Sequence, residues 1–240
     1  MRVLFDASIF IHANFHILKK FVEGPIDSKE LGKRVVNQIE SICLDKFEGY
    51  DVVLALEGGD NFRKKLSSEY KASRTTPDID FEIVEHTLRG SFRCIKKRGL
   101  EADDVAFVYS RIYPDCVLVS EDNDYYLMLD EQRAVYKYKQ KKMIRRCKDT
   151  HLMECILKVC HGCDSDEIPK IKLKRFGPSF IMKFIRENKL NLKDSLDVLE
   201  AMDYISDWSL NYDLAMYDLE TYIKYLGQEP IQKLVELCQQ

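Results

Sequence analysis

The sequence lacks any apolar run of the length that a signal peptide or a membrane-spanning helix needs. In the first twenty residues, Asp6, His12 and His16 interrupt the apolar side chains. A bilayer span takes about 20 predominantly apolar residues, so we expect a protein of the cytoplasm with no membrane partner. The 240 residues are 45% hydrophobic, enough for a large core in one domain or two small ones.

The sequence also lacks the paired cysteine clusters of a structural zinc site. Eight cysteines are present, and without a secretion signal we expect reduced thiols rather than a disulfide framework. The stretch ECILKVCHGC is the exception, because Cys155, Cys160 and Cys163 with His151 or His161 have ligand types that bind zinc. Its spacing has no second pair, which favours core and loop thiols.

A large net charge is missing too. The formal value is −3, which by itself argues against a polyanionic partner. The charges are nevertheless segregated along the chain. Residues 132–148 hold eight basic residues and no acid, and residues 168–186 hold six and none, whereas Glu187 onward carries eleven acids against four lysines. With two shorter basic stretches at 62–74 and 88–98, this pattern favours phosphate binding.

The first 150 residues alternate short apolar runs with longer helical patterns, which predicts an α/β fold with a mainly parallel central sheet flanked by helices. The candidate strands are 2–5, 52–56 and 116–119, and acids follow each one directly. The carboxyl ends of parallel strands lie at one edge of a sheet, so these acids should converge there. They are Asp6, Glu57, Asp122 and Asp124.

The motif GLEADD at 99–104 adds Glu101, Asp103 and Asp104 at the start of a predicted helix. Each acid alone is explained by helix capping. Six or seven carboxylates together need a compensating cation, and all-oxygen sites suit Mg²⁺ or Mn²⁺. Two such ions would fit hydrolysis of a phosphodiester, with one activating water and both stabilising charge on the phosphate.

Five motifs, in this order, resemble the flap endonuclease/5′-nuclease superfamily, especially the phage RNase H-type 5′-nucleases and the 5′-nuclease domain of bacterial DNA polymerase I. They are VLFDAS at 3–8, ALEGGDNFRKKLSSEYKASR at 55–74, GLEADD at 99–104, VLVSEDNDYYLML at 117–129 and GCDSDEIP at 162–169. The resemblance covers about residues 1–185 and implies a PIN/5′-nuclease-like fold. It implies a nuclease core at 1–150 with a helical arch near 60–98, and a mainly helical DNA-binding region at 151–240 packed on the core, with a degenerate helix-hairpin-helix near 164–186.

The resemblance also implies roles for individual residues. Around the first metal ion it places Asp6, Glu57, Glu101, Asp103, Asp104 and Asp122, and nearer the second ion Asp124, Asp164 and Asp166. Lys71 and Arg74 would approach the scissile phosphate from the arch, where Tyr70 would stack on a base and Arg63 and Lys64 would contact DNA. Further DNA contacts would come from Lys170, Lys172, Lys174, Arg175, Gly177 and Ser179.

The implied activity is that of an Mg²⁺-dependent 5′-nuclease, monomeric, in a bacterial cell or phage-infected host, with replication proteins as possible partners. Its substrates would be 5′ flaps, 5′-ended duplexes or RNA–DNA hybrids at primers. Two alternatives stay open, a PIN-type ribonuclease and a non-catalytic scaffold that binds branched DNA. One departure concerns the second ion, because Cys163 stands where the family has an aspartate and Asp164 follows one place later. Glu57 replaces an expected aspartate, and the glycine pattern of the hairpin is reduced to Gly177 and Ser179.

Overall fold

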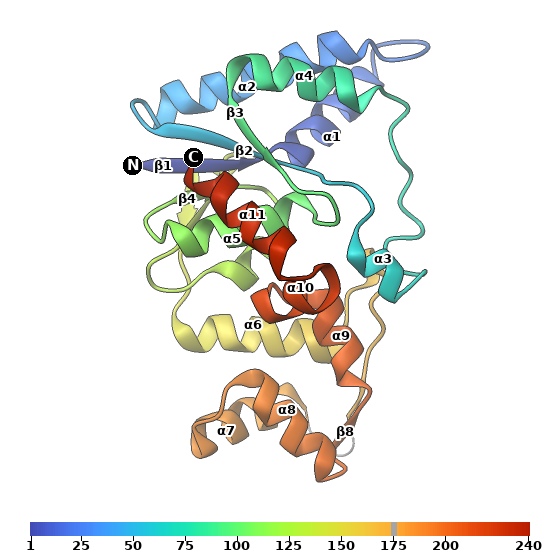
Figure 1. The fold of residues 1–240 in the computed structure, drawn as a ribbon, viewed down its shortest axis with the longest axis vertical. Coiled ribbons are helices and arrows are strands. Elements are labelled where there is room, and N and C mark those ends of the chain that lie inside the picture. Colours follow the sequence, from blue (N-terminus) through green and yellow to red (C-terminus); the bar gives the residue numbers. More distant parts are fainter. Residues whose placement is uncertain (174–176) are drawn as a thin grey trace.

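A six-stranded sheet forms the centre of this computed structural model, which describes residues 1–173 and 177–240 (Figure 1). The strands lie in the order β3 (Arg93–Lys96), β2 (Asp51–Leu56), β1 (Arg2–Asp6), β4 (Val117–Val119), β5 (Ala134–Lys137) and β6 (Lys142–Ile144). All neighbours are parallel except β5 and β6. The mainly parallel sheet is confirmed, and the three predicted strands are present with ends shifted by at most one residue.

Three strands of this sheet were not predicted, because β3, β5 and β6 lie in stretches that stand out in the sequence for their basic charge. β3 and β6 are edge strands in which every side chain except Ile95 is half-exposed or exposed, so their sequences lack the continuous apolar run of a buried parallel strand. β5 is buried throughout, including Lys137. Its ammonium donates to the carbonyl oxygen of Asp122 at 2.7 Å, which satisfies the buried charge.

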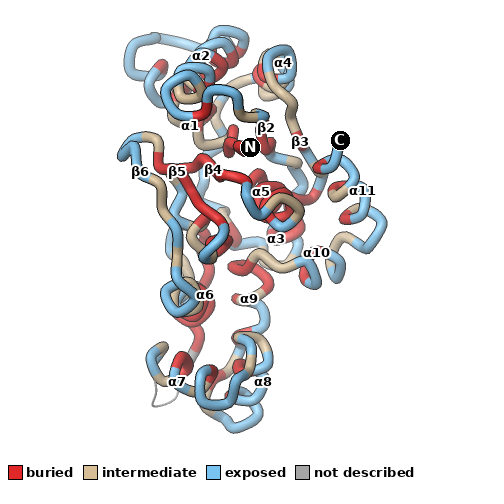
Figure 2. The backbone as a smooth tube through the Cα atoms, turned by 90° about the vertical axis from the view of Figure 1, so that its left-hand side faces the viewer, coloured by how far each residue is buried: buried red, intermediate tan, exposed pale blue. Residues whose placement is uncertain are grey.

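Helices cover both faces of the sheet. On one face α1 (Ala7–Leu18), α2 (Ser28–Lys46) and α4 (Phe81–Ser91) pack on Val3 and Phe5, and on the other α5 (Ala102–Ile112) packs on Leu4. This division follows the alternation of side chains along a strand. Figure 2 shows the buried strands and α5 between the exposed outer surfaces of the helices.

The remaining helices extend this core. A third hydrophobic cluster joins α6 (Lys148–His161), α7 (Pro178–Asn188), α8 (Leu192–Ala201) and α9 (Trp208–Ala215). The degenerate helix-hairpin-helix near 164–186 stays a prediction, because part of that range lies outside the described residues. A small antiparallel pair, β7 (Lys172–Leu173) and β8 (Ile205–Ser206), lies beside α7 and α8.

The C-terminal helices α10 (Leu219–Leu226) and α11 (Gln228–Gln239) return to the core beside the sheet. Tyr222, Ile231, Leu234 and Cys238 belong to the same buried cluster as α5. Removing everything after residue 150 would therefore expose part of the core that packs on α5. The division of the chain near residue 150 stays a prediction.

The predicted arch between β2 and β3 contains one short helix, α3 (Phe62–Leu66), followed by turns and extended chain at 67–80. The second helix of this range, α4, packs against α2 on the sheet. Within the predicted arch near 60–98, α3 is therefore the helix that lies near the strand ends, and the chain after it at 67–80 is not helical.

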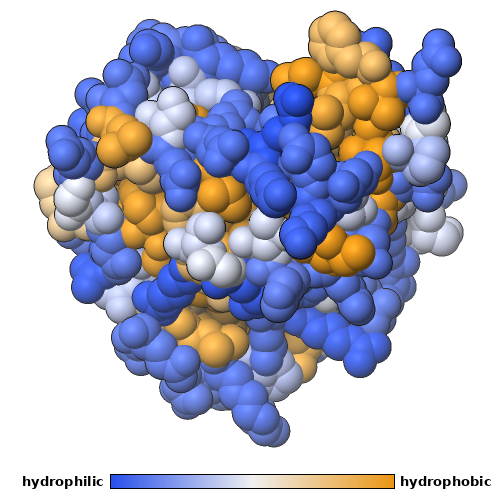
Figure 3. All heavy atoms as spheres, turned by 90° about the horizontal axis from the view of Figure 1, so that it is seen from above, coloured by the Kyte–Doolittle hydropathy of each residue, from blue (hydrophilic) through white to orange (hydrophobic). Residues whose placement is uncertain are grey.

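The face seen from above is mainly hydrophilic, with apolar patches between the polar side chains (Figure 3). Large exposed apolar side chains on the molecule include Phe21 and Leu44. Isolated ones of this kind are normal on a folded surface. In the part of the chain that the structure describes, no helix combines the length and apolar character needed to cross a bilayer.

Candidate active site

Carboxylates from separate elements meet at the carboxyl edge of the sheet, as predicted. Asp6 ends β1, Glu57 follows β2 and Asp122 follows β4. Capping explains part of their placement. Asp6 accepts the Ser8 N–H at 3.1 Å at the start of α1, and Asp122 accepts the Asp124 N–H at 3.0 Å at the start of the 3-10 helix η1 (Asn123–Met128). Asp6 and Asp122 thus cap the helices that follow them, and both lie at the carboxyl edge of the sheet.

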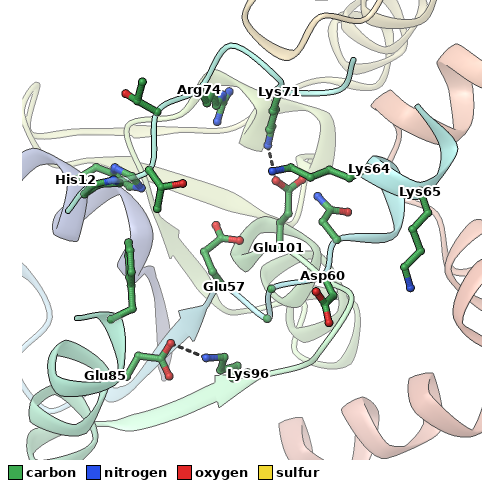
Figure 4. A pocket seen from close by; sticks show the side chains of 17 residues that line it. His12, Glu57, Asp60, Lys64, Lys65, Lys71, Arg74, Glu85, Lys96 and Glu101 are labelled. Atoms are coloured by element: carbon green, nitrogen blue, oxygen red, sulfur yellow. Dashed lines mark hydrogen bonds and ion pairs between the residues drawn. The ribbon is translucent and has the colours of Figure 1, made fainter. Parts of the chain in front are cut away.

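Gly58 brings Glu57 close to Glu101. A Cβ atom at Gly58 would lie 1.7 Å from the carbonyl oxygen of Lys97, so only glycine fits here without a backbone shift. The Gly58 N–H donates to the carbonyl oxygen of Leu100 at 2.9 Å, which ties the chain after β2 to the start of α5. In Figure 4, Glu57 and Glu101 extend side by side into the same cleft, and the Glu101 carboxylate points toward Lys71.

The acidic start of α5 is a compact cluster. Glu101, Asp103 and Asp104 each place one carboxylate oxygen within 4.8 Å of the others. Asp104 is fully buried, and its two oxygens accept from Nη1 and Nη2 of Arg63 at 2.7 Å. It also accepts from the Tyr222 hydroxyl at 2.6 Å. This bonding argues against a free ligand oxygen on Asp104, although it belongs to the cluster.

Two predicted DNA contacts are wrong for reasons of burial. Arg63 is 1% exposed, because it pairs with Asp104 and donates from Nε to the carbonyl oxygen of Leu214 at 2.9 Å. Tyr70 is 4% exposed, and its hydroxyl donates to Glu101 at 2.9 Å. Neither side chain is placed to contact a base or phosphate. Both instead hold the carboxylates in position.

Lys71 connects the segment after α3 with the cluster. Its ammonium lies 2.6 Å from Glu101, and its N–H donates to the carbonyl oxygen of Asp166 at 3.1 Å. The backbone of Lys71 is left-handed, with φ at +53°, a conformation uncommon outside glycine. Its predicted role at the scissile phosphate stays a prediction, and this geometry places its charge at the carboxylates.

The acids at this edge of the sheet carry more negative charge than the cations beside them neutralise. Six carboxylates make up this first group, and among the described residues Arg63 and Lys71 are the only cations that form ion pairs with any of them, at Glu101 and Asp104. The six are Asp6, Glu57, Glu101, Asp103, Asp104 and Asp122. The excess appears as raised pKa values. Burial raises the pKa of Asp6, and burial with the charges of Glu101 and Asp104 raises that of Asp103 well above its ordinary value.

A second group of acids lies beside the first and differs from it. Lys158 on α6 places its ammonium 2.9 and 2.8 Å from the two oxygens of Asp124 and 3.1 Å from Asp166. The other Asp166 oxygen accepts from Arg74 at 2.6 Å. Asp164 is exposed, in the 3-10 helix η2 (Asp164–Asp166). Of the described residues, only Glu101, Asp103 and Asp104 place three ligand atoms within 4.8 Å of one another.

A cleft of about 700 Å³ opens beside the first group and is lined by both acidic and basic side chains. Basic side chains there include Lys64, Lys65, Lys71, Arg74 and Lys96, which come from α3, the segment after it and β3 (Figure 4). A cleft with cations around a carboxylate floor suits a phosphodiester whose charge is held beside a metal ion.

The other predicted DNA contacts lie further along the chain. Lys170 and Ser179 are exposed, and Gly177 is the N-cap of α7. Lys172 lies in β7, whereas Lys174 and Arg175 fall outside the described residues. These assignments stay predictions.

The cysteines match the interpretation as thiols. All eight are free, and Cys155 and Cys160 lie in the third hydrophobic cluster. Cys155 Sγ is 3.7 Å from His151 Nε2, a contact between one cysteine and one histidine rather than a four-ligand zinc site.

Comparison with known proteins decides the family. The family model of the 5′-3′ exonuclease N-terminal, resolvase-like domain matches residues 1–155. The chain belongs to the 5′-3′ exonuclease family. Its fold is similar to that of the bacteriophage T5 D15 protein co-crystallised with metal ions, with a TM-score of 0.67, 18% identity, and coverage of 99% of this chain and 97% of that one.

Two further structures have the same fold. The T5 5′-exonuclease with bound zinc has a TM-score of 0.66 and 19% identity over 99% of this chain and 98% of that chain. The catalytic core of Rad2 in complex with a DNA substrate has a TM-score of 0.51 and 14% identity over 98% of this chain and 92% of that chain. The predicted 5′-nuclease superfamily is therefore confirmed.

Sequence reasoning missed three side chains of the site. Tyr217 donates to Asp103 at 2.9 Å, Tyr222 donates to Asp104, and Lys158 bridges Asp124 and Asp166. The two tyrosines lie more than 110 residues from their partners in the chain, so no local spacing could reveal them. Lys158 stands near the GCDSDEIP motif, but its orientation depends on how α6 packs.

Glu57 predicts a pH-dependent stability. Removal of water by the surrounding protein, with the charges of Glu101 and Asp6, raises the pKa of Glu57 from 4.5 to about 7. The folded state therefore binds more protons than the unfolded state between these values, and ionisation of Glu57 lowers stability as pH rises through them. In EDTA, we expect Glu57→Gln to raise Tm at pH 8 and to equal the wild type at pH 4.

The same variant should lose part of the stabilisation that Mg²⁺ gives the wild type at pH 8, because a ligand that binds only the folded state raises Tm. Thermal unfolding in EDTA and in Mg²⁺ measures both effects. Glu23→Gln, at an exposed position, is the matched control and should change neither. A lower Tm for Glu57→Gln in EDTA at pH 8 would contradict the assigned charge repulsion.

Proposed function

We propose that this protein is a divalent-metal-dependent 5′-nuclease that hydrolyses phosphodiester bonds of branched or 5′-ended DNA. The observation that carries the proposal is the excess of carboxylates over paired cations in the first group, next to a cleft lined by basic side chains. Its family membership supports the same activity.

The residues of the first group fit a hard cation. Their donors are all carboxylate oxygens, and the raised pKa values of Asp6, Glu57 and Asp103 are those of acids whose ionised form needs a nearby positive charge. Glu57, Glu101, Asp103 and Asp122, with Asp6 behind them, would hold Mg²⁺ or Mn²⁺. When bound, such an ion supplies charge to the phosphate and activation to water.

The chain's own side chains bind and orient the substrate. Lys71 and Arg74 face the cleft and would hold the phosphate oxygens on which negative charge develops. Lys64, Lys65 and Lys96 would follow the backbone of the strand, which gives binding without base specificity. Tyr70 and Arg63, both buried, would fix Glu101 and Asp104 from behind.

The proposal also names a more specific class of substrate. 5′ flaps and RNA–DNA hybrids at primers are the expected substrates, and a monomer is the expected form. In a reaction with two ions, Asp124, Asp164 and Asp166 would hold the second one. We base the proposed chemistry on the first group, because Lys158 and Arg74 already neutralise Asp124 and Asp166.

The test is cleavage mapping on labelled 5′-flap, nicked and RNA–DNA hybrid substrates, with Mg²⁺ and with EDTA. We expect products only with the divalent ion. Asp122→Asn removes one charge from the first group and should reduce cleavage by at least about 100-fold while branched-DNA affinity is kept. Asp115→Asn, at an exposed position before β4, is the control and should cleave like the wild type.

If the unmodified protein with Mg²⁺ leaves every substrate intact while binding branched DNA, the scaffold alternative replaces this proposal. Cleavage of single-stranded RNA in preference to all 5′-ended DNA substrates would favour the PIN-type ribonuclease instead.

A further inference from the structure

Lys158 occupies the centre of the second acidic group. Its ammonium makes three contacts of 2.8 to 3.1 Å with carboxylate oxygens of Asp124 and Asp166. The Lys158 side chain is 11% exposed and that of Asp166 is 4% exposed, so the contact is largely withdrawn from solvent. Pairs with this little exposure are not screened as surface ion pairs are.

The charges in this group balance without a metal ion. Asp124 and Asp166 carry two negative charges, and Lys158 and Arg74 pair with them. A divalent ion placed here would have to displace an ammonium that already satisfies three carboxylate lone pairs. The first group has the opposite balance, because its carboxylates outnumber the cations that pair with them.

The chain also lacks a ligand at this point. Cys163 stands where the resemblance places an aspartate, and its thiol contacts the Ser165 hydroxyl at 3.1 Å. A neutral thiol adds no charge, and oxygen ligands suit Mg²⁺ better than sulfur. Asp164 follows, but it is exposed, and no triad of ligand atoms forms here among the described residues.

The loop around Cys163 is held in this arrangement. Gly162 has φ at +66°, and a Cβ atom there would lie 2.1 Å from the carbonyl oxygen of Ile168, so the loop closes tightly on itself. The Cys163 N–H donates to the carbonyl oxygen of Ile168, and the Asp166 N–H donates to the carbonyl oxygen of Cys163. These bonds set Asp166 against Lys158 and leave Asp164 outside.

We infer that Lys158 takes the place of the second metal ion, so that this 5′-nuclease binds a single divalent ion tightly, at the first group. The inference rests on the proposed function and narrows it. Lys158 acts as a positioning residue that holds Asp124 and Asp166 and contributes a fixed positive charge near Lys71 and Arg74.

The test counts bound Mn²⁺ by electron paramagnetic resonance, with and without saturating 5′-flap DNA that carries a cleavage-resistant linkage. We expect one tightly bound ion for the wild type in both cases. In the double variant Cys163→Asp/Lys158→Met, which supplies a carboxylate and removes the ammonium, we expect two, with the affinity of the second ion increased roughly 100-fold.

Matched controls lie at the other end of α6. Cys147→Asp and Lys148→Met repeat both changes at exposed positions, about 20 Å away by the rise of a helix of this length. They should leave the count at one. Because Lys158 is largely buried, its replacement could prevent folding. Circular dichroism checks that each variant folds, and Lys158→Gln provides a second, polar replacement that also removes the charge.

Two tightly bound ions in the wild type would overturn the inference while leaving the proposed function in place. No bound ion in any variant would overturn both. A folded double variant that still binds one ion would also contradict the inference. The wild-type count needs no variant, so the inference stays testable if the substitutions prevent folding.

Discussion

Arg63→Met is expected to lower the free energy of unfolding by about 3–5 kcal/mol, because it leaves the Asp104 carboxylate buried without its partner. Asp104 is fully buried, and burial alone would raise its pKa, but the Arg63 guanidinium holds it below the ordinary value. The change also removes the donor to the carbonyl oxygen of Leu214, which joins α3 to α9. Urea denaturation measures the loss.

Two further variants make this prediction specific. Arg63→Met with Asp104→Asn removes the unpaired charge and should recover a large part of the loss. Arg98→Met removes an arginine whose side chain is 84% exposed and should change stability by no more than about 0.5 kcal/mol. A loss below about 1 kcal/mol for Arg63→Met would show that the buried pair is not required for the fold.

Lys71→Met is expected to reduce the single-turnover cleavage rate by about 100- to 1,000-fold at saturating enzyme and Mg²⁺, since a fixed cation beside a reacting phosphate acts mainly in the transition state. The Lys71 side chain is 13% exposed and its ammonium is already directed at the carboxylates, so it needs little reorganisation to act there. DNA affinity should fall much less, because one phosphate contact among several is lost.

Lys64→Met is the control for this prediction. Lys64 is exposed on α3 and lines the same cleft. Its loss should weaken DNA binding and its dependence on salt, with cleavage at saturation changed only about threefold. If Lys71→Met cleaves as fast as Lys64→Met, Lys71 serves only as the partner of Glu101. Partial recovery in Lys71→Arg would support the role of its charge.

Local patterns in the sequence predicted the frame of the site well. Acids directly after short apolar strands must lie at one edge of a parallel sheet, and this placed Asp6, Glu57 and Asp122 correctly relative to one another. The start of α5 could also be predicted, because an acidic first turn before an apolar run is typical of a helix start. Strands β3, β5 and β6 were missed because their basic side chains obscured short apolar patterns.

The roles of individual polar side chains were less predictable. The resemblance to the family implied DNA contacts for Arg63 and Tyr70, whereas without the neighbouring motif Tyr70 would be taken as a core aromatic. Folding buries both against Glu101 and Asp104, more than 30 residues away. Burial depends on which element packs over a residue, and here that element is α9, from the distant C-terminal part of the chain.

The sequence by itself determined three strands of the sheet (β1, β2 and β4), the convergence of the acids and the family, because these follow from short-range periodicity and ordered motifs. The tertiary structure alone decided which acids are neutralised. Arg63 meets Asp104, and Lys158 meets Asp124 and Asp166, across distances in sequence at which no pattern constrains a side chain. The balance of charge at each group is a property of packing, and it separates a group with unpaired carboxylates from one whose carboxylates are paired with cations.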